Sequence, residues 1–150
     1  EIEDISIHIE DADNSYESIG ASDRVELFFR RNSMMNPYYC LEIDTNARVM
    51  DFKALPNRKF DFHWSWPIGQ LKVKSITGKK GFKVEGSISI DSLKALGLIQ
   101  NGSIDTGIYR AKYDLNDRFG YIPTWLTWVN PMTTLPDFHV GSSFGVLDLT

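Results

Sequence analysis

The sequence lacks several features that would point directly to a function. It holds a single cysteine, Cys40, which excludes an internal disulfide and any metal site built from several cysteines. No apolar run approaches the roughly 20 residues that a membrane helix needs. Neither a glycine-rich phosphate loop nor a block of lysines and arginines is present, and the net charge is −4. We therefore expect no membrane span and no nucleic-acid partner.

Motifs for catalysis are missing as well. His139 lies near Ser142 and Ser143, but no G-x-S-x-G motif surrounds these serines. Cys40 falls inside a predicted strand, where a structural thiol is the usual role. The 20 acidic residues offer many carboxylate pairs for glycoside hydrolysis, and the sequence does not rank them. We expect a protein that is not an enzyme and has no catalytic residues.

What the sequence does have is a period-two alternation of apolar residues, which predicts strands. Hydrophobic residues make up 42% and charged residues 24% of the 150 residues, as in a globular protein. The alternating segments are 4–10, 24–30, 38–44, 48–54, 59–66, 71–77, 81–90, 105–113 and 144–149. The T-G-K-K-G sequence predicts a hairpin between the sixth and the seventh of these segments.

One helix signal interrupts the strands. In D-S-L-K-A-L-G-L, Asp91 is the predicted N-cap and Gly97 the predicted stop. Residues 11–23 are polar and without period, so we predict a loop there. The expected fold class is all-β: one domain over residues 1–150, an antiparallel, jelly-roll-like β-sandwich with one short connecting helix.

The loop offers one candidate metal site. Asp11, Asp13 and Asn14 carry oxygen ligands of the type that calcium takes. Calcium needs six to eight such oxygens, and the rest of the loop does not follow an EF-hand. The alternatives are a calcium site at Asp11 and Asp13 and a solvated acidic turn.

Aromatic residues suggest a binding surface. Phe60, Phe62, Trp64 and Trp66 alternate with polar residues, so on a strand all four share one face. Such a row is either core or a platform for stacking sugar rings. Trp66 precedes Pro67 at the predicted strand end, so we expect it, rather than Trp64, to reach a loop surface.

A second tryptophan pair follows a different pattern. Trp125 and Trp128 are three residues apart, which places them on opposite faces of an extended chain. One should be a core anchor and the other exposed. Because V-N-P ends the strand after Trp128, we expect Trp128 to be the platform at the strand edge and Trp125 the anchor.

Polar residues occupy the other phase of several strands. Glu26, Glu42 and Arg110 stand at such positions, and neighbouring strands could gather them into one charged floor. Carboxylates and guanidinium groups form hydrogen bonds of defined geometry with sugar hydroxyls. The alternative is an ordinary solvated face of a sheet.

Five segments in order resemble one known family. They are S-D-R-V-E-L-F-F, Y-Y-C-L-E-I-D, G-F-K-V-E-G-S-I-S-I-D-S-L-K-A-L-G-L, G-I-Y-R-A-K-Y, and W-L-T-W-V-N-P followed by P-D-F-H-V-G-S-S-F-G-V-L-D-L. Their order is similar to that of carbohydrate-binding module family 9, a group of DOMON-like β-sandwich domains, over about residues 5–150. Each motif alone is weak, and the order carries the resemblance.

The resemblance implies a non-catalytic domain that holds a sugar between two tryptophans, with polar side chains on its hydroxyls. It also implies attachment to secreted glycan-degrading enzymes and, in some members, a structural calcium ion. This chain departs from the pattern, because Gly20 and Ala21 stand where a tryptophan precedes the D-x-V-E strand. Either one jaw of the clamp is missing, or Tyr16 or Trp66 replaces it.

The sequence thus predicts a carbohydrate-binding domain that recognises an oligo- or polysaccharide. The predicted ligand-binding residues are Trp128, Trp66, Trp125, Glu26, Glu42 and Arg110. The chain begins at Glu1 without a charged apolar leader, and we expect a secreted or periplasmic protein whose signal peptide is removed. Two alternatives stay open. One is a structural or interaction domain that kept the fold and lost the clamp; the other is a haem-binding DOMON-like module with methionine and histidine ligands.

Overall fold

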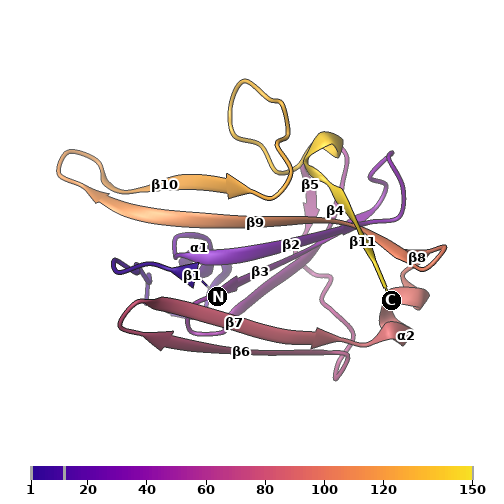
Figure 1. The fold of residues 1–150 in the computed structure, drawn as a ribbon, viewed down its shortest axis with the longest axis horizontal. Helices are drawn as coiled ribbons and strands as arrows, with labels where there is room; N and C mark the ends of the chain where they lie inside the picture. Colours follow the sequence, from indigo (N-terminus) through magenta and orange to yellow (C-terminus); the bar gives the residue numbers. More distant parts are fainter. Residues whose placement is uncertain (1, 12, 150) are drawn as a thin grey trace.

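Two antiparallel sheets pack against each other in this protein as a sandwich, with two short helices (Figure 1). The structure is a computed structural model that describes residues 2–11 and 13–149. The predicted all-β sandwich is therefore confirmed. None of the described helices is both long and apolar enough to span a bilayer.

The elements follow one another along the chain. They are β1 (Ile2–Glu3), α1 (Tyr16–Gly20), β2 (Arg24–Arg30), β3 (Tyr38–Asp44), β4 (Val49–Leu55), β5 (Lys59–Asp61), β6 (Leu71–Gly78), β7 (Gly81–Ile88), α2 (Ile90–Ala95), β8 (Ile99–Gln100), β9 (Ser103–Asn116), β10 (Gly120–Thr127), a 3-10 turn at Gly141–Ser143 and β11 (Gly145–Asp148). The larger sheet has the order β10-β9-β2-β3-β4-β5, with β8 and β11 also paired to β9. The smaller sheet has the order β1-β7-β6. The long strand β9 thus organises the larger sheet.

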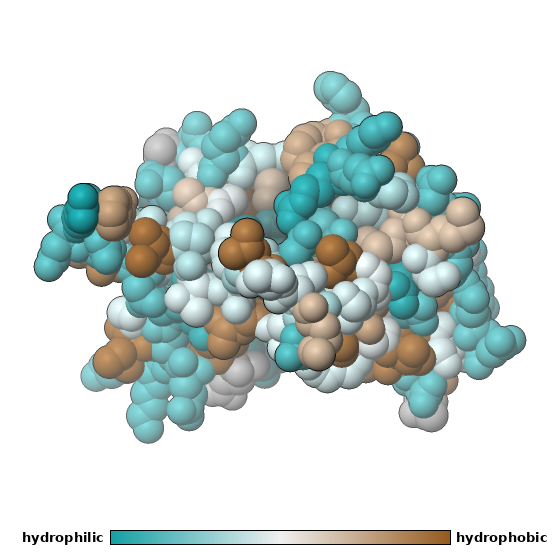
Figure 2. Space-filling view, turned by 90° about the horizontal axis from the view of Figure 1, so that it is seen from above, coloured by the Kyte–Doolittle hydropathy of each residue, from teal (hydrophilic) through white to brown (hydrophobic). Residues whose placement is uncertain are grey.

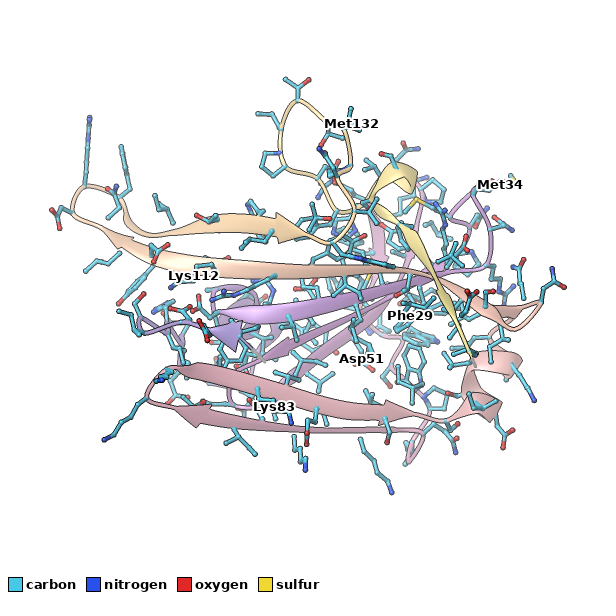
Figure 3. All side chains as sticks on the ribbon, viewed as in Figure 1. Phe29, Met34, Asp51, Lys83, Lys112 and Met132 are labelled. Atoms are coloured by element: carbon cyan, nitrogen blue, oxygen red, sulfur yellow. The ribbon has the colours of Figure 1, made fainter. Side chains whose placement is uncertain are left out.

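Both faces of the larger sheet are covered, each by different parts of the chain. We call the first the loop face, because α1 and the 131–144 loop supply Ile19, Phe138 and Phe144 to its core. We call the second the sheet face, because it looks toward β6, β7 and α2 and packs Phe29, Leu41 and Leu93. Figure 3 shows Phe29 on this second side, between the two layers. Every residue of β3 is buried as a result, so no sheet face at β3 is solvated.

Two predictions about the N-terminal part are wrong. Residues 4–10 form no strand, and the backbone N–H groups of His8 and Glu10 donate to side chains instead of a neighbouring strand: Asp23 Oδ2 accepts from His8 and Ser22 Oγ from Glu10. The predicted loop contains α1, which Ser15 caps by accepting from the backbone of Ser18.

Two further predictions need correction. Helix α2 lies where it was expected, but Ser89 rather than Asp91 is its N-cap. The predicted strand 59–66 ends at Asp61, whose carboxylate accepts from the backbone N–H of His63 and turns the chain. The row of four aromatics therefore does not share one face, since Phe60 packs in the loop-face core and Trp66 in the sheet-face core.

Candidate functional site

A small polar pocket of about 180 Å3 lies on the loop face of the larger sheet. Its floor comes from β2 and β3 and its walls from β10, the turn after β4 and the 131–144 loop. The residues that line it are Arg24, Glu26, Glu42, Arg58, Trp125, Pro136, Asp137, Phe138 and His139. The volume is below the ~300–1,000 Å3 of sites for drug-sized ligands, so the pocket suits a single small ring or the end of a chain.

Strand register creates the floor of this pocket. Glu26 on β2 lies directly opposite Glu42 on β3, and both side chains point to the loop face. Trp125 on β10 pairs with Ala111 on β9, which in turn pairs with Arg24 on β2. Because Ala111 is small and fully buried between them, the Arg24 guanidinium reaches to 5.5 Å from the centre of the Trp125 ring.

Arg24 connects the two carboxylates of the floor. Its Nε donates to Glu42 Oε2 at 2.6 Å, and its Nη1 donates to the carbonyl of Gly20. Its Nη2 lies 2.9 Å from Glu26 Oε1, an ion-pair distance. That contact does not meet hydrogen-bond geometry, so within the described residues Glu26 Oε1 is a buried oxygen with no hydrogen-bond partner.

The floor carries one positive group and two carboxyl groups. Burial raises the pKa of Glu26 to about 8, and repulsion from Glu42 adds to the rise while Arg24 opposes it. Burial also raises the pKa of Glu42, again against the attraction of Arg24. The pair therefore holds a proton more readily than exposed glutamates do, and Glu26 can donate or accept a hydrogen bond.

One wall of the pocket comes from the 131–144 loop. Asp137 accepts from the backbone N–H of His139 at 2.9 Å, and Arg58 Nη2 donates to Asp137 Oδ1 at 2.5 Å. Phe138 packs edge-on against Trp125 and stacks on Tyr109. These contacts fix the loop over the floor and leave the Trp125 ring half-buried.

His139 is part of this wall as a neutral ring. Its Nδ1 lies 3.0 Å from the hydroxyl of Tyr38, and its ring lies against Phe28 and Phe60. Burial lowers the pKa of His139 to about 4, and the charge of Arg58 adds to this effect. His139 is thus a structural hydrogen-bonding residue at neutral pH.

The six predicted binding residues divide between the two faces of the larger sheet. Trp125, Glu26 and Glu42 meet in the polar pocket. Arg110 lies on the sheet face, where it pairs with Asp4 and lies over the Phe82 ring. The expected single charged floor therefore lacks Arg110.

The remaining two predicted residues also lie away from the pocket. Trp66 is only 5% exposed, and its indole Nε1 donates to Ser92 Oγ, so the prediction that Trp66 reaches a loop surface is wrong. Trp128 is 48% exposed on the sheet face, opposite to Trp125, as the spacing of three predicts. Tyr16, the other substitute for the missing jaw, donates its hydroxyl to Asp51 outside the pocket.

Four lining residues with polar or charged side chains were not among the predicted binding residues: Arg24, Arg58, Asp137 and His139. Arg24 stands two residues before Glu26, so the strand period could have placed both on one face. The other three lie in turns and loops, where no period operates.

One of the two predicted metal ligands, Asp13, has other partners. Asp13 Oδ1 accepts from the backbone of Ser15 and from Ser18 Oγ, which lowers the pKa of Asp13 to about 2. Across residues 2–11 and 13–149, no cluster of three or more His, Cys, Asp or Glu side chains is arranged for a metal ion. Calcium at Asp11 and Asp13 stays a prediction.

Comparison with known proteins gives a structural likeness. No family model matches the chain, and no curated protein does. A solved structure described as a "putative carbohydrate-binding protein" from Bacteroides uniformis has a similar fold, with a TM-score of 0.65. The match covers 97% of this chain and 69% of that chain at 17% sequence identity. The likeness shows that this chain shares the sandwich fold of that protein.

Proposed function

We propose that this protein binds carbohydrate in the polar pocket and does not hydrolyse it. The observation that carries the proposal is Glu26 Oε1, a buried oxygen at the pocket floor that has no hydrogen-bond partner among the described residues, although Arg24 Nη2 lies 2.9 Å from it as an ion pair. A buried polar atom without a partner is costly, and a ligand hydroxyl placed there would remove the cost. The fold shared with a protein described as carbohydrate-binding supports the same proposal.

The chemistry of the lining fits one sugar ring. The Trp125 ring offers a flat apolar surface for the C–H groups of the sugar, and its indole is held in place by Arg24 and Phe138. Glu26 and Asp137 offer oxygens to hydroxyl groups, and Arg58 offers N–H donors at the rim. The pocket has one tryptophan rather than two, so the clamp expected from the resemblance is one-sided here.

The arrangement of the carboxyl groups supports binding over hydrolysis. Glycosidases place two carboxyl groups on either side of the bond that breaks, about 5–9.5 Å apart. Glu26 and Glu42 instead stand side by side on adjacent strands and share Arg24. Because both carboxyl groups belong to the floor, they face a bound sugar from the same side. They therefore cannot stand on opposite sides of a glycosidic bond.

The proposal is tested by titrating sugars while the fluorescence of the protein is followed, with a glycan array to select them. We expect binding that Trp125→Ala weakens by about tenfold, the loss of one aromatic stacking contact. Trp128→Ala is the matched control, because it removes a half-exposed tryptophan from the opposite face. The proposal fails if no sugar binds, or if Trp128→Ala abolishes binding while Trp125→Ala leaves it intact.

A further inference from the structure

The two layers of the sandwich do not close along one side. A groove of about 800 Å3 runs between them, on the face of the larger sheet opposite to the polar pocket. Aliphatic side chains from both layers line it: Val25, Leu27 and Ile43 on the larger sheet, and Val73 and Val84 on the smaller one. The space is therefore apolar and open to solvent at once.

The apolar lining continues onto an exposed surface of the larger sheet. Ile108, Leu126, Trp128 and Leu147 line the groove, and each is between 37% and 48% exposed. A contiguous apolar surface of this kind is rare on a protein with nothing bound to it and is typical of an interaction site. The upper face of the molecule, by contrast, mixes hydrophilic side chains with scattered apolar ones (Figure 2).

The smaller sheet is incomplete beside this groove. Strand β6 pairs with β7 along its whole length, from Gly81 to Ile88. Strand β1 pairs with the other edge of β7 only through Ile2 and Glu3, opposite Phe82 and Gly81. Within the part of the chain that the structure describes, no strand pairs with this edge of β7 from Val84 to Ile88. The exposed edge of a sheet is a template for one more strand.

We propose that β7 binds an extended peptide segment as an added strand, antiparallel to β7 and in line with β1. A segment in this place satisfies both observations, because its backbone pairs with the β7 edge and its side chains fill the groove. An aliphatic small molecule would fill the groove and leave the edge unpaired. The proposal concerns the sheet face and does not depend on sugar binding at the loop face.

The register of β1 fixes which residues the segment needs. Directly opposite residues of an antiparallel pair point to the same face, as Ile2 and Phe82 do. Segment residues opposite Val84, Gly86 and Ile88 therefore point into the groove and have to be apolar. Gly86 adds no side chain of its own, so the largest residue of the segment fits there. The alternating positions point to solvent and are polar.

Synthetic peptides test the proposal on the unsubstituted protein. One peptide of about eight residues alternates valine or isoleucine with threonine or lysine, and its control has the same composition with the apolar residues in one block. We expect the alternating peptide to bind at least about tenfold more tightly, since only its apolar side chains all reach the groove. Hydrogen exchange of the backbone amides should slow within Val84–Ile88 when it binds.

A pair of neighbouring substitutions locates the site. Leu147 and Val146 are adjacent on β11, both are exposed, and only Leu147 lines the groove. Leu147→Lys should weaken peptide binding by about tenfold or more, whereas Val146→Lys should leave it unchanged. The exchange measurement on the unsubstituted protein keeps the test valid if Leu147→Lys does not fold.

Several outcomes would overturn the proposal. Equal affinity for the two peptides would show that an alternating, strand-like pattern of apolar residues is not needed for binding. Binding of palmitate with no slowed exchange in β7 would make the groove a lipid site. A dimer in sedimentation that Leu147→Lys dissociates would make the occupant a second copy of the chain. If neither peptide binds, the proposal that β7 accepts an added strand is wrong.

Discussion

Glu26 and Glu42 lie directly opposite each other on adjacent strands, both buried, with the single guanidinium of Arg24 between them. Like charges at such a position destabilise a sheet unless a counter-charge or a proton is present. The arrangement is costly to fold and does not add an apolar contact to the core. Such clusters occur where a site needs polar groups fixed in place before a ligand arrives.

The first prediction concerns the charge balance of the floor. Arg24→Met should lower the free energy of unfolding by about 3–5 kcal/mol, because it leaves two buried carboxyl groups without their cation. Urea unfolding near neutral pH measures the change. Adding Glu26→Gln and Glu42→Gln to Arg24→Met should recover part of the loss. No recovery in the triple variant would show that the loss comes from packing of the arginine side chain instead.

The second prediction concerns alkaline pH. The pKa of Glu26 is raised in the folded protein, from 4.5 to about 8, mainly by burial. The folded state therefore binds more protons than the unfolded state in this window, so stability is full below pH 4.5 and falls as the pH rises toward about 8. Glu26→Gln should flatten the fall in melting temperature between about pH 5 and about pH 9. Glu10→Gln, at an exposed position, is the control and should leave the slope unchanged.

The third prediction concerns acidic pH. The pKa of His139 is lowered from 6.5 to about 4, mainly by burial, so between these values the unfolded state binds the extra proton. Stability should therefore fall as the pH drops from 6.5 toward 4. His139→Gln keeps a polar partner for Tyr38 and does not titrate, so its melting temperature should fall less over this range. His63→Gln, at an exposed histidine, is the matched control. An equal pH slope in the His139 variant would contradict the prediction.

The fourth prediction separates core tryptophans from binding tryptophans. Ser92→Ala leaves the buried indole N–H of Trp66 without its acceptor and should cost about 1–3 kcal/mol. Trp66→Phe should destabilise the protein as well, because the ring packs against Phe29 and Tyr39. Both variants should bind sugar as the unsubstituted protein does, once measured below their melting temperatures. Loss of sugar binding in Trp66→Phe with the fold intact would return Trp66 to the binding site.

Much of the sheet could be predicted from the sequence. Strands β2 and β3 match their predicted bounds, because alternation and flanking turn residues agree there. The same alternation predicted a strand over residues 4–10 that the structure does not contain. A period of two shows which side chains would share a face of a strand, but it does not show whether a partner strand exists. Only tertiary contacts, such as Asp23 accepting from the backbone of His8, decide that.

The site was less accessible to sequence reasoning. Strand period places Glu26 and Glu42 in one phase, and register then makes them neighbours. The period could not tell that both faces of β2 and β3 are covered, so these residues were expected on a solvated or ligand-binding surface rather than in a buried floor. Asp137 and His139 belong to the wall of the pocket, about a hundred residues along the chain from the floor, and lie in a loop with no regular pattern.

Because the floor of the pocket comes from a sheet and part of its wall from a loop, amino-acid substitutions in the floor and in the wall have different consequences. The floor is held by the hydrogen-bond ladder of β2 and β3 and by Arg24, so a substitution there alters folding as well as binding. The 131–144 part of the wall pairs with no strand among the described residues, so its exposed positions are freer to vary than the floor, whereas Phe138 and Phe144 are buried in the core. Related chains that keep Arg24, Glu26 and Glu42 and differ around 131–144 would then share one buried floor and differ in the ligand they select.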